Sequence, residues 1–302
     1  MTLAALAARL PSSLEIVLAD VGSAGGLHRR WAPVRRHVRA VLFDPLDQSA
    51  GAGRDLYIPV ALAGARGRAA IHVTKRASMT SALLPNTELL KRFWDKEAHT
   101  EIERSFEAPT DTLDKVVAEN GLKLDALKID VQGGEYDILL GAQAALNDVF
   151  LAEIETSFFE RYLGLRTFDA VIALMRERGF DLVDISRIKR YRYRNSAGVV
   201  NPGLGLGDRA GRIAFCDAIF LARDETLARR IEAEGADFTL KLMVTLLVYG
   251  KADMAAHAFD QGAARLPSAL RDDFARYFKS VSGVGFSLKR VHRAVDYLAR
   301  KV

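Results

Sequence analysis

Seven short apolar segments, each typical of a β-strand, recur along this sequence and constrain its fold more than any other feature. They span residues 15–20, 40–44, 57–63, 126–130, 150–155, 181–186 and 215–222. The early segments are almost continuously apolar, as expected for strands that helices cover on both faces. Apolar residues at helical spacing follow in residues 136–147 and 168–178. This alternation predicts an α/β fold with a doubly wound, mostly parallel sheet of seven strands.

Carboxylates stand at the ends of four of these predicted strands. They are Asp20, Asp44, Asp130 and Glu155. Right-handed crossovers bring the carboxyl ends of parallel strands to one edge of the sheet, which is where such sheets bind ligands. We therefore expect the four side chains to line one functional rim, with Asp130 directly before a turn that contains Gly133 and Gly134.

Two parts of the chain depart from the alternation. Residues 64–110 form a long insertion with a predicted helix from Asn86, its N-cap, to about Ser105, and connections of this length are often lids or substrate walls. From Asp224 to Val302 the pattern is helical throughout. We expect a first domain over residues 1–223 and a helical appendage over residues 224–302. The appendage would pack on its own chain or form a homodimer, and contact of its basic, apolar last helix with a membrane surface is the less favoured alternative.

The composition excludes several other classes of protein. A single cysteine, Cys216, leaves no internal disulfide or cysteine-rich zinc site, and no run approaches the roughly 20 apolar residues that span a bilayer. With no signal peptide recognised, these features favour a cytoplasmic protein. We do not expect a nucleic-acid partner from the net charge of +5. Five basic residues alternate with Tyr191 and Tyr193 and suggest an anionic substrate: Arg187, Lys189, Arg190, Arg192 and Arg194.

A glycine-rich loop follows the first predicted strand in the sequence LADVGSAGG. Asp20 ends the strand, and the loop consists of Gly22, Ser23, Ala24, Gly25 and Gly26. The dinucleotide pattern G-x-G-x-x-G fails here at Ala24 and Leu27, whereas D-x-G-x-G-x-G fits with Ala24 as its one departure. An acid before such a loop suits a cationic ligand end, such as the amino group of S-adenosylmethionine (SAM). Asp44, in the segment FDP, could accept hydrogen bonds from both ribose hydroxyls.

These motifs are similar to those of the FkbM-type methyltransferases, a family of the class I SAM-dependent superfamily. The resemblance covers about residues 14–223 and rests on DVGSAGG, on FDP and, most specifically, on residues 112–142. It implies a Rossmann-like methyltransferase sheet, SAM as methyl donor, S-adenosylhomocysteine (SAH) as product, and O-methylation of a sugar, glycan precursor or related small molecule. It also implies a cofactor site that consists of Asp20, Gly22, Ser23, Ala24, Gly25, Gly26, Asp44, Pro45, Ala63 and Asp130. Ala63 stands where the family often has an acid, and Gly134 where it often has an aromatic residue.

Methyl transfer to a hydroxyl requires a group that takes up the hydroxyl proton. The candidates are Asp130, Glu155 and Glu135, although Glu135 could instead only cap its helix. We favour proton transfer without a metal; a Mg²⁺ ion held by two or three of the carboxylates is the alternative. Two other functions stay open: a catalytically silent module that binds SAM or another nucleotide, and an NAD-dependent sugar-modifying enzyme.

Overall fold

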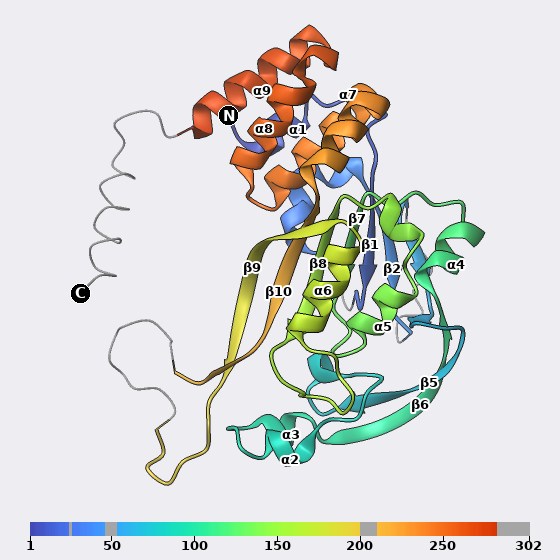
Figure 1. Cartoon of the computed structure of the whole chain (residues 1–302), viewed down its shortest axis with the longest axis vertical. Helices are drawn as coiled ribbons and strands as arrows, with labels where there is room; N and C mark the ends of the chain where they lie inside the picture. The colour runs from blue at the N-terminus through green and yellow to red at the C-terminus, as the bar shows by residue number, and fades with distance from the viewer. Residues whose placement is uncertain (24–25, 46–52, 200–209, 283–302) are drawn as a thin grey trace. The chain divides into compact units, whose positions relative to one another are not determined.

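The computed structural model describes residues 1–23, 26–45, 53–199 and 210–282 (Figure 1). Contacts between residues divide the chain into two compact units. The larger unit consists of residues 16–28 and 38–227, and the smaller of residues 1–15, 29–37 and 228–302. The domain boundary expected after Arg223 stays a prediction.

The larger unit is built on a central sheet with the strand order β3-β2-β1-β7-β8-β10-β9. Its strands are β1 (Ile16–Val21), β2 (Val38–Phe43), β3 (Leu56–Ile58), β7 (Ala126–Ile129), β8 (Leu151–Ser157), β9 (Phe180–Tyr191) and β10 (Arg212–Ala222). The first five strands in this order are parallel, and β10 is antiparallel to both β8 and β9. Every residue of β1 and β8 is buried, as the apolar segments predicted. The expected mostly parallel, seven-stranded α/β sheet is confirmed within the described residues.

The strand order reverses at β1, and this reversal determines where a ligand can bind. β1 pairs with β2 on one side and with β7 on the other, so that Asp20 lies between Leu42 and Lys128 in register. In doubly wound sheets the crevice outside the carboxyl ends of the strands at such a switch point is the usual ligand site. The ends of β1, β2 and β7 are therefore the first place to look for function.

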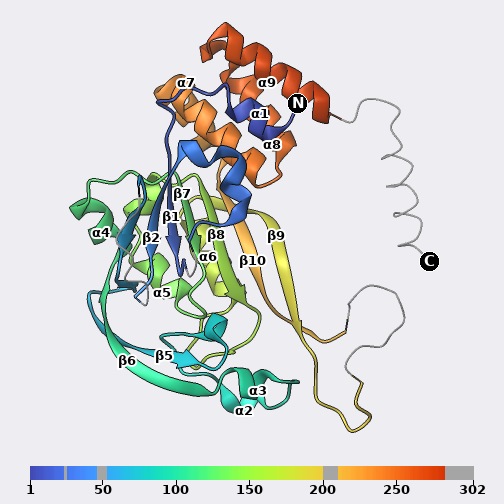
Figure 2. The same ribbon diagram turned by 180° about the vertical axis from the view of Figure 1, so that it is seen from behind.

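Helices of the larger unit lie on the sheet largely where the sequence predicted them. α6 (Phe168–Glu177) confirms the helix expected over residues 168–178, and α5 (Glu135–Leu140) followed by a 3-10 turn, η3 (Ala145–Asn147), replaces the single helix expected over 136–147. α4 (Leu113–Glu119) begins after Thr112, whose hydroxyl accepts a hydrogen bond from the Lys115 N–H. Both α5 and α6 lie on one face of the sheet (Figures 1 and 2).

The insertion over residues 64–110 differs most from its prediction. It contributes to a second sheet of order β4-β6-β5, with β4 (Ala61–Leu62), β5 (Gly67–Thr74) and β6 (Ile102–Asp111). The segment expected as one strand over 57–63 is split at Pro59, which has no N–H to donate, into β3 and β4. Between β5 and β6 the chain forms a 3-10 turn, η2 (Ala77–Met79), and two short helices, α2 (Thr87–Leu90) and α3 (Lys96–His99).

The long helix expected from Asn86 to about Ser105 is therefore wrong, although its start is correct. The Asn86 side chain accepts a hydrogen bond from the Leu89 N–H at 3.2 Å and caps α2. Asp95 then adopts a left-handed backbone with φ of 58°, which interrupts the helical path before α3. From Ile102 onward the residues pair with β5. The hydrogen bonds between these two strands satisfy the backbone N–H and C=O groups, which a helix would otherwise have to do.

The smaller unit is helical and joins the two ends of the chain. It contains α1 (Leu3–Ala7), a 3-10 segment η1 (Arg29–His37), most of α7 (Asp224–Val248), α8 (Ala252–Gly262), a short 3-10 turn η4 (Ala263–Arg265) and α9 (Ser268–Val281). Arg9 of the N-terminal segment binds Asp273 of α9 at 2.6 Å, and Trp31 packs edge-on against Tyr249. The helical tail is thus confirmed through Val281, whereas its predicted last helix lies outside the described residues. Within those residues, no helix is both long and apolar enough to cross a membrane.

Candidate active site

The turn after β1 brings main chain directly onto the end of β7. Gly22 has φ of 81°, and a Cβ added there would overlap the carbonyl oxygen of Asp130. The Gly22 N–H donates to the carbonyl oxygen of Phe43 at the end of β2, at 2.9 Å. The hydroxyl oxygen of Ser23 is buried and has no hydrogen-bond partner among the described residues. This turn therefore presents backbone and one unsatisfied hydroxyl at the switch point; Ala24 and Gly25 lie outside the described residues.

A Gly22→Ala variant is expected to lower the free energy of unfolding by about 2–3 kcal/mol, since it combines left-handed strain with overlap of a backbone atom. Gly26→Ala is the matched control, because Gly26 has φ of 87° but open space where its Cβ would lie. That control should lose only the strain, about 1–2 kcal/mol. Denaturant unfolding of the two variants measures the difference, and equal losses would show that Gly22 and Asp130 are not in close contact.

Asp20 lies at the same edge but already has a cationic partner. Its side chain is buried, and Lys128 of β7 binds it at 3.0 Å. Burial raises the pKa of Asp20, while the attraction of Lys128 opposes the shift. The sequence analysis did not single out Lys128, although its position in an otherwise apolar strand was a signal. The acid expected to receive the cationic end of SAM is therefore largely neutralised from within the protein.

The other residues predicted to bind the cofactor occupy two different places. Asp44 and Pro45 follow β2 directly, and the hydrogen bond between Gly22 and Phe43 holds that strand end beside the glycine turn. Ala63 instead follows β4 of the small sheet, where its N–H donates to the carbonyl oxygen of Asp111. The structure thus brings Asp44 to the glycine turn, and a contact of Ala63 with a cofactor stays a prediction.

Asp130 and Glu155, predicted to lie near each other, are joined by the amide of Gln132. The Gln132 side chain donates to Asp130 at 2.9 Å and to Glu155 at 2.8 Å. Gln132 reaches both because its backbone is left-handed, with φ of 63°, and Gly133 follows with φ of 127°. The Asp130 N–H donates to the carbonyl oxygen of Val21, which fixes the turn against β1. The structure therefore brings this predicted pair together at the end of β7.

Two arginines complete the charge balance of this site. Arg161 is 1% exposed and binds Glu155 at 2.9 Å. Arg187 of β9 reaches three carboxylates: Glu155 at 2.9 Å, Asp217 at 2.8 Å and Asp130 at 3.2 Å. No group of three or more histidine, cysteine, aspartate or glutamate side chains in the described part of the chain is arranged to hold a metal ion. The acidic side chains here are bridged by guanidinium groups.

The three candidate acids differ in exposure and therefore in what they can do. Asp130 is the accessible one, since its side chain is 21% exposed while that of Glu155 is 2% exposed. Burial raises the pKa of Glu155 to about 8; the nearby charge of Asp130 adds to the shift, and Arg161 and Arg187 oppose it. Burial likewise raises the pKa of Glu135 to about 6. The Glu135 carboxylate accepts hydrogen bonds from the N–H groups of Val131 and Gly133, which favours the alternative that it holds the turn.

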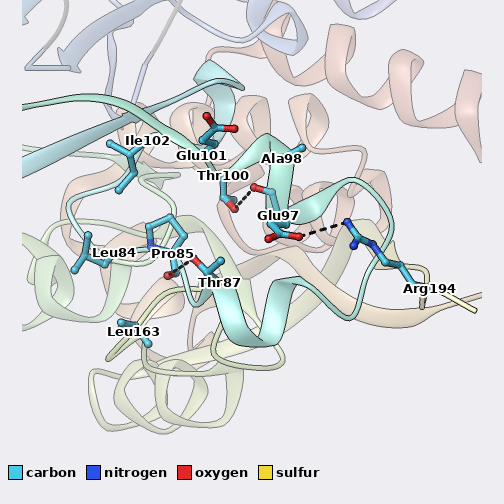
Figure 3. Close-up of a pocket in the computed structure, with 10 residues that line it drawn as sticks. All are labelled: Leu84, Pro85, Thr87, Glu97, Ala98, Thr100, Glu101, Ile102, Leu163 and Arg194. Atoms are coloured by element: carbon cyan, nitrogen blue, oxygen red, sulfur yellow. Dashed lines mark hydrogen bonds and ion pairs between the residues drawn. The ribbon is translucent and has the colours of Figure 1, made fainter.

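A groove of about 670 Å³ opens near this turn (Figure 3). Its apolar wall includes Leu84, Pro85, Ile102 and Leu163, and its polar wall includes Thr87, Thr100, Glu97, Glu101 and Arg194. The groove is tied to the turn by Ser81, which donates to the Gln132 carbonyl oxygen at 2.8 Å, three residues before Leu84. Three residues of chain span at most about 10 Å, so the groove begins within that distance of Ser81. Leu163 likewise follows Tyr162, whose hydroxyl lies 3.4 Å from the Gln132 amide oxygen.

A comparison with models of protein families identifies the family of this chain. The family model for the methyltransferase FkbM domain matches residues 26–182, just over half of the chain. The chain belongs to the FkbM methyltransferase family. The family match covers most of the larger unit, from Gly26 through α6, and so includes Asp44, Asp130 and Glu155.

Solved structures give weaker likenesses. The methyltransferase FkbM from Methylobacillus flagellatus is 13% identical, with a TM-score of 0.35; the match covers 71% of this chain and 45% of that protein. A protein from Thermoplasma acidophilum, provisionally assigned as a methyltransferase, is 9% identical with a TM-score of 0.32, over 70% of this chain and 69% of its own. The FkbM-family chain thus spans less than half of the M. flagellatus protein. A search of curated proteins found no match.

Proposed function

We propose that this FkbM-family chain is a SAM-dependent methyltransferase that methylates a hydroxyl group of a small molecule or glycan precursor. The observation that carries the proposal is the junction between the glycine turn and the acid at the end of β7. Gly22 packs against the backbone of Asp130 with no room for a side chain, so a ligand lying over the turn would lie beside the Asp130 carboxylate. A methyltransferase that acts on a hydroxyl needs its methyl-donor site and its proton acceptor close together.

The residues at the switch point fit SAM. Ser23 has a buried hydroxyl without a partner among the described residues, and the absent side chain at Gly22 leaves main chain for close approach. Asp44 would accept hydrogen bonds from the ribose hydroxyls, in the role that an acid at this strand end has in related nucleotide sites. When bound, SAM supplies a methyl group on a positively charged sulfur. SAH would leave from the same residues.

Asp130 is the residue that we assign to the acceptor proton. It is the exposed carboxylate of the pair, and hydrogen bonds from Gln132 and Arg187 fix its direction. Glu155 lies behind it on the same two partners, and with its pKa raised to about 8 it holds a proton near neutral pH, which leaves Asp130 as the carboxylate that can accept one. We propose that proton transfer proceeds without a metal ion, since the carboxylates already have guanidinium partners.

The acceptor is proposed to extend from Asp130 into the groove beside Leu84 and Leu163. Most of the basic residues once expected to bind an anionic substrate are engaged within the protein. Arg187 binds three carboxylates, Arg190 donates to the carbonyl oxygen of Gly211, and Arg194 lies 3.6 Å from Glu97. An acceptor with hydroxyls and an apolar body fits the groove lining best.

Calorimetry with SAM, SAH and NAD on the purified chain tests the proposal. We expect saturable binding of SAM and SAH and none of NAD. Binding of NAD alone would instead support the sugar-modifying enzyme. Transfer of label from methyl-tritiated SAM to a panel of sugars, nucleotide-sugars and hydroxylated lipids then tests catalysis. SAM binding without transfer to any of them would favour the catalytically silent module.

Asp44→Ala is expected to weaken SAM binding by about 1.5–3 kcal/mol, roughly 10- to 150-fold in Kd, because the ribose hydroxyls lose an ionised acceptor. Asp181→Ala is the control, since Asp181 is an exposed acid whose contact with Arg223 lies at 3.7 Å. Calorimetric titration of both variants measures the effect. A folded Asp44→Ala protein with wild-type SAM affinity would remove Asp44 from the cofactor site.

A further inference from the structure

A cluster of cationic side chains lies around α3, next to the groove, which Glu97 and Ala98 of the same helix line. Three segments meet there through backbone hydrogen bonds: the Trp94 N–H donates to the Arg192 carbonyl oxygen, and the Arg76 N–H donates to that of His99. These contacts bring Arg76, Lys96, Arg192 and His99 into one neighbourhood. Lys96 and His99 are three residues apart on α3 and therefore lie on the same side of it.

The positive charges of this cluster act against one another. Burial lowers the pKa of Lys96, and the charges of Arg76 and Arg192 lower it further, while Asp95 opposes them. Burial also lowers the pKa of His99, with Lys96 and Arg76 acting in the same direction. Groups of like charge that lie together and half-buried are costly unless an anion joins them.

Two buried nitrogen atoms beside these cations lack the partners that buried polar groups ordinarily have. They are the indole Nε1 of Trp94 and the Nδ1 of His99, and neither has a hydrogen-bond partner within the described residues. The indole N–H is a donor only, and the neutral imidazole donates when Nδ1 carries its proton. Residues 94–99 therefore combine two donors that lack a partner within the described residues with the positive charge of Lys96, which Asp95 offsets in part.

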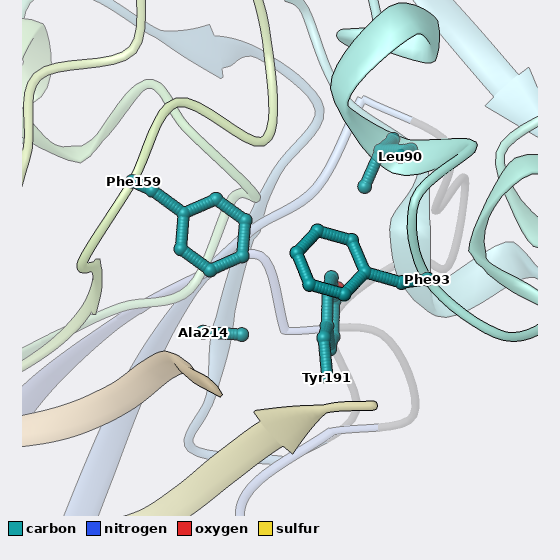
Figure 4. Close-up of a cluster of buried hydrophobic side chains, with 5 residues drawn as sticks. All are labelled: Leu90, Phe93, Phe159, Tyr191 and Ala214. Carbon is teal, nitrogen blue, oxygen red and sulfur yellow. The ribbon is translucent and has the colours of Figure 1, made fainter. Parts of the chain in front are cut away.

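Buried apolar side chains beside this cationic cluster strengthen the interactions of its charges. Next to it lies a cluster of buried hydrophobic side chains: Leu90, Phe93, Phe159, Tyr191 and Ala214 (Figure 4). The Lys96 ammonium group lies 4.8 Å from the centre of the Tyr191 ring. The hydroxyl of Tyr191 also accepts a hydrogen bond from Arg161 at 3.3 Å, so Tyr191 contacts both Lys96 and a residue of the active site. Charges beside such apolar side chains are screened less than charges in open water.

We propose that Arg76, Lys96, Arg192, Trp94 and His99 form a binding site for a phosphate group. Phosphate suits the cluster because it carries between one and two negative charges near neutral pH and several acceptor oxygens, which arginine forks and N–H donors bind well. The site is separate from the methyl-transfer residues and does not depend on them. Its ligand is either inorganic phosphate or the phosphate group of an organic molecule.

Titration of the full chain with inorganic phosphate, at constant ionic strength set with chloride, tests the proposal. We expect a saturable change in tryptophan fluorescence, absent from Trp94→Phe, and a rise in Tm that depends on phosphate concentration. Lys96→Gln should weaken binding roughly 10- to 100-fold, because it removes a hydrogen-bonded charge. Lys91→Gln is the matched control: Lys91 is an exposed lysine of the same region that binds Glu88 at 2.8 Å, and its loss should leave phosphate binding unchanged.

A parallel titration with glucose 6-phosphate separates the two sources of phosphate. Binding of the ester as tightly as inorganic phosphate would indicate an organic ligand, whereas exclusion of the ester would indicate free phosphate; both outcomes support the site. Wild-type protein that shows no saturable response to either compound would overturn the proposal, as would equal affinities of wild type and Lys96→Gln. Arg76→Gln, which changes an exposed side chain, replaces Lys96→Gln should that variant fail to fold.

Discussion

An Asp130→Asn variant is expected to bind SAM with nearly wild-type affinity and to turn over about 10²- to 10⁴-fold more slowly, the usual range for loss of a general base. Asparagine has nearly the shape of aspartate and can still accept the hydrogen bond from Gln132, so the turn after β7 should keep its structure. What the variant loses is the capacity to take up the acceptor proton. Calorimetry with SAM, together with methyl transfer to the acceptor that the labelling experiment identifies, measures the two effects separately.

Asp217→Asn is the matched control for this variant. Asp217 shares Arg187 with Asp130 but lies on β10 and is 9% exposed at its side chain. If the rate of the Asp130 variant falls only because Arg187 loses a partner, both variants should slow equally. Methyl transfer by Asp130→Asn at close to the wild-type rate would show that another group accepts the proton.

Arg161→Met is expected to lower the free energy of unfolding by about 3–5 kcal/mol, the scale for removal of one member of a buried ion pair. Arg161 is almost wholly buried and hydrogen-bonds to Glu155, Ser157 and Tyr191, so methionine leaves these groups without their partner. Denaturant unfolding measures the loss. Arg166→Met, which changes an exposed arginine stacked on Tyr136, should alter stability by no more than about 0.5 kcal/mol.

The loss caused by Arg161→Met should also widen as the pH rises above about 8. In the wild type the folded-state pKa of Glu155 is raised from 4.5 to about 8, so the folded protein binds the proton more tightly than the unfolded chain. Stability therefore falls as the pH rises through this interval and then levels off. Without Arg161 the folded-state pKa lies higher still, and the fall continues. Addition of Glu155→Gln to the variant should flatten this dependence, and a pH-independent loss would contradict the assignment.

The regular part of the fold could be predicted from the sequence because its information is local. An almost continuously apolar segment such as that of β1 reports burial on both faces, and the sequence spacing of the parallel strands requires crossover connections. The long helix predicted after Asn86 was wrong, and the reason is partly local as well. Its cap and apolar spacing are real, but Asp95 leaves the helical region and β6 gains a partner strand that only tertiary structure supplies.

The acidic residues of the candidate site could be predicted, whereas most of their partners could not. Asp130 and Glu155 follow from strand ends that must meet at one edge. The two hydrogen bonds of Gln132 depend on a left-handed backbone, which glutamine rarely adopts. Arg187 likewise has a positive φ, of 45°, within β9. Arg161 and Arg187 come from separate segments, and no spacing rule connects them with Glu155. In the sequence Arg187 stood out only as one of five clustered basic residues, and Arg161, beside Glu160, belonged to no pattern.

The close contact between Gly22 and the Asp130 backbone has a consequence for engineering. The glycine turn and the acid form one block with no spare volume, so neither tolerates redesign without the other. The opposite wall of the site consists of residues 81–102. It contacts the turn after Asp130 through the Ser81 hydroxyl, which donates to the Gln132 carbonyl oxygen, and through Leu83, which packs against Gly133. Exchange of that wall between relatives is the natural route to a new acceptor range for the proposed methyltransferase, because the residues proposed to bind SAM can be left untouched.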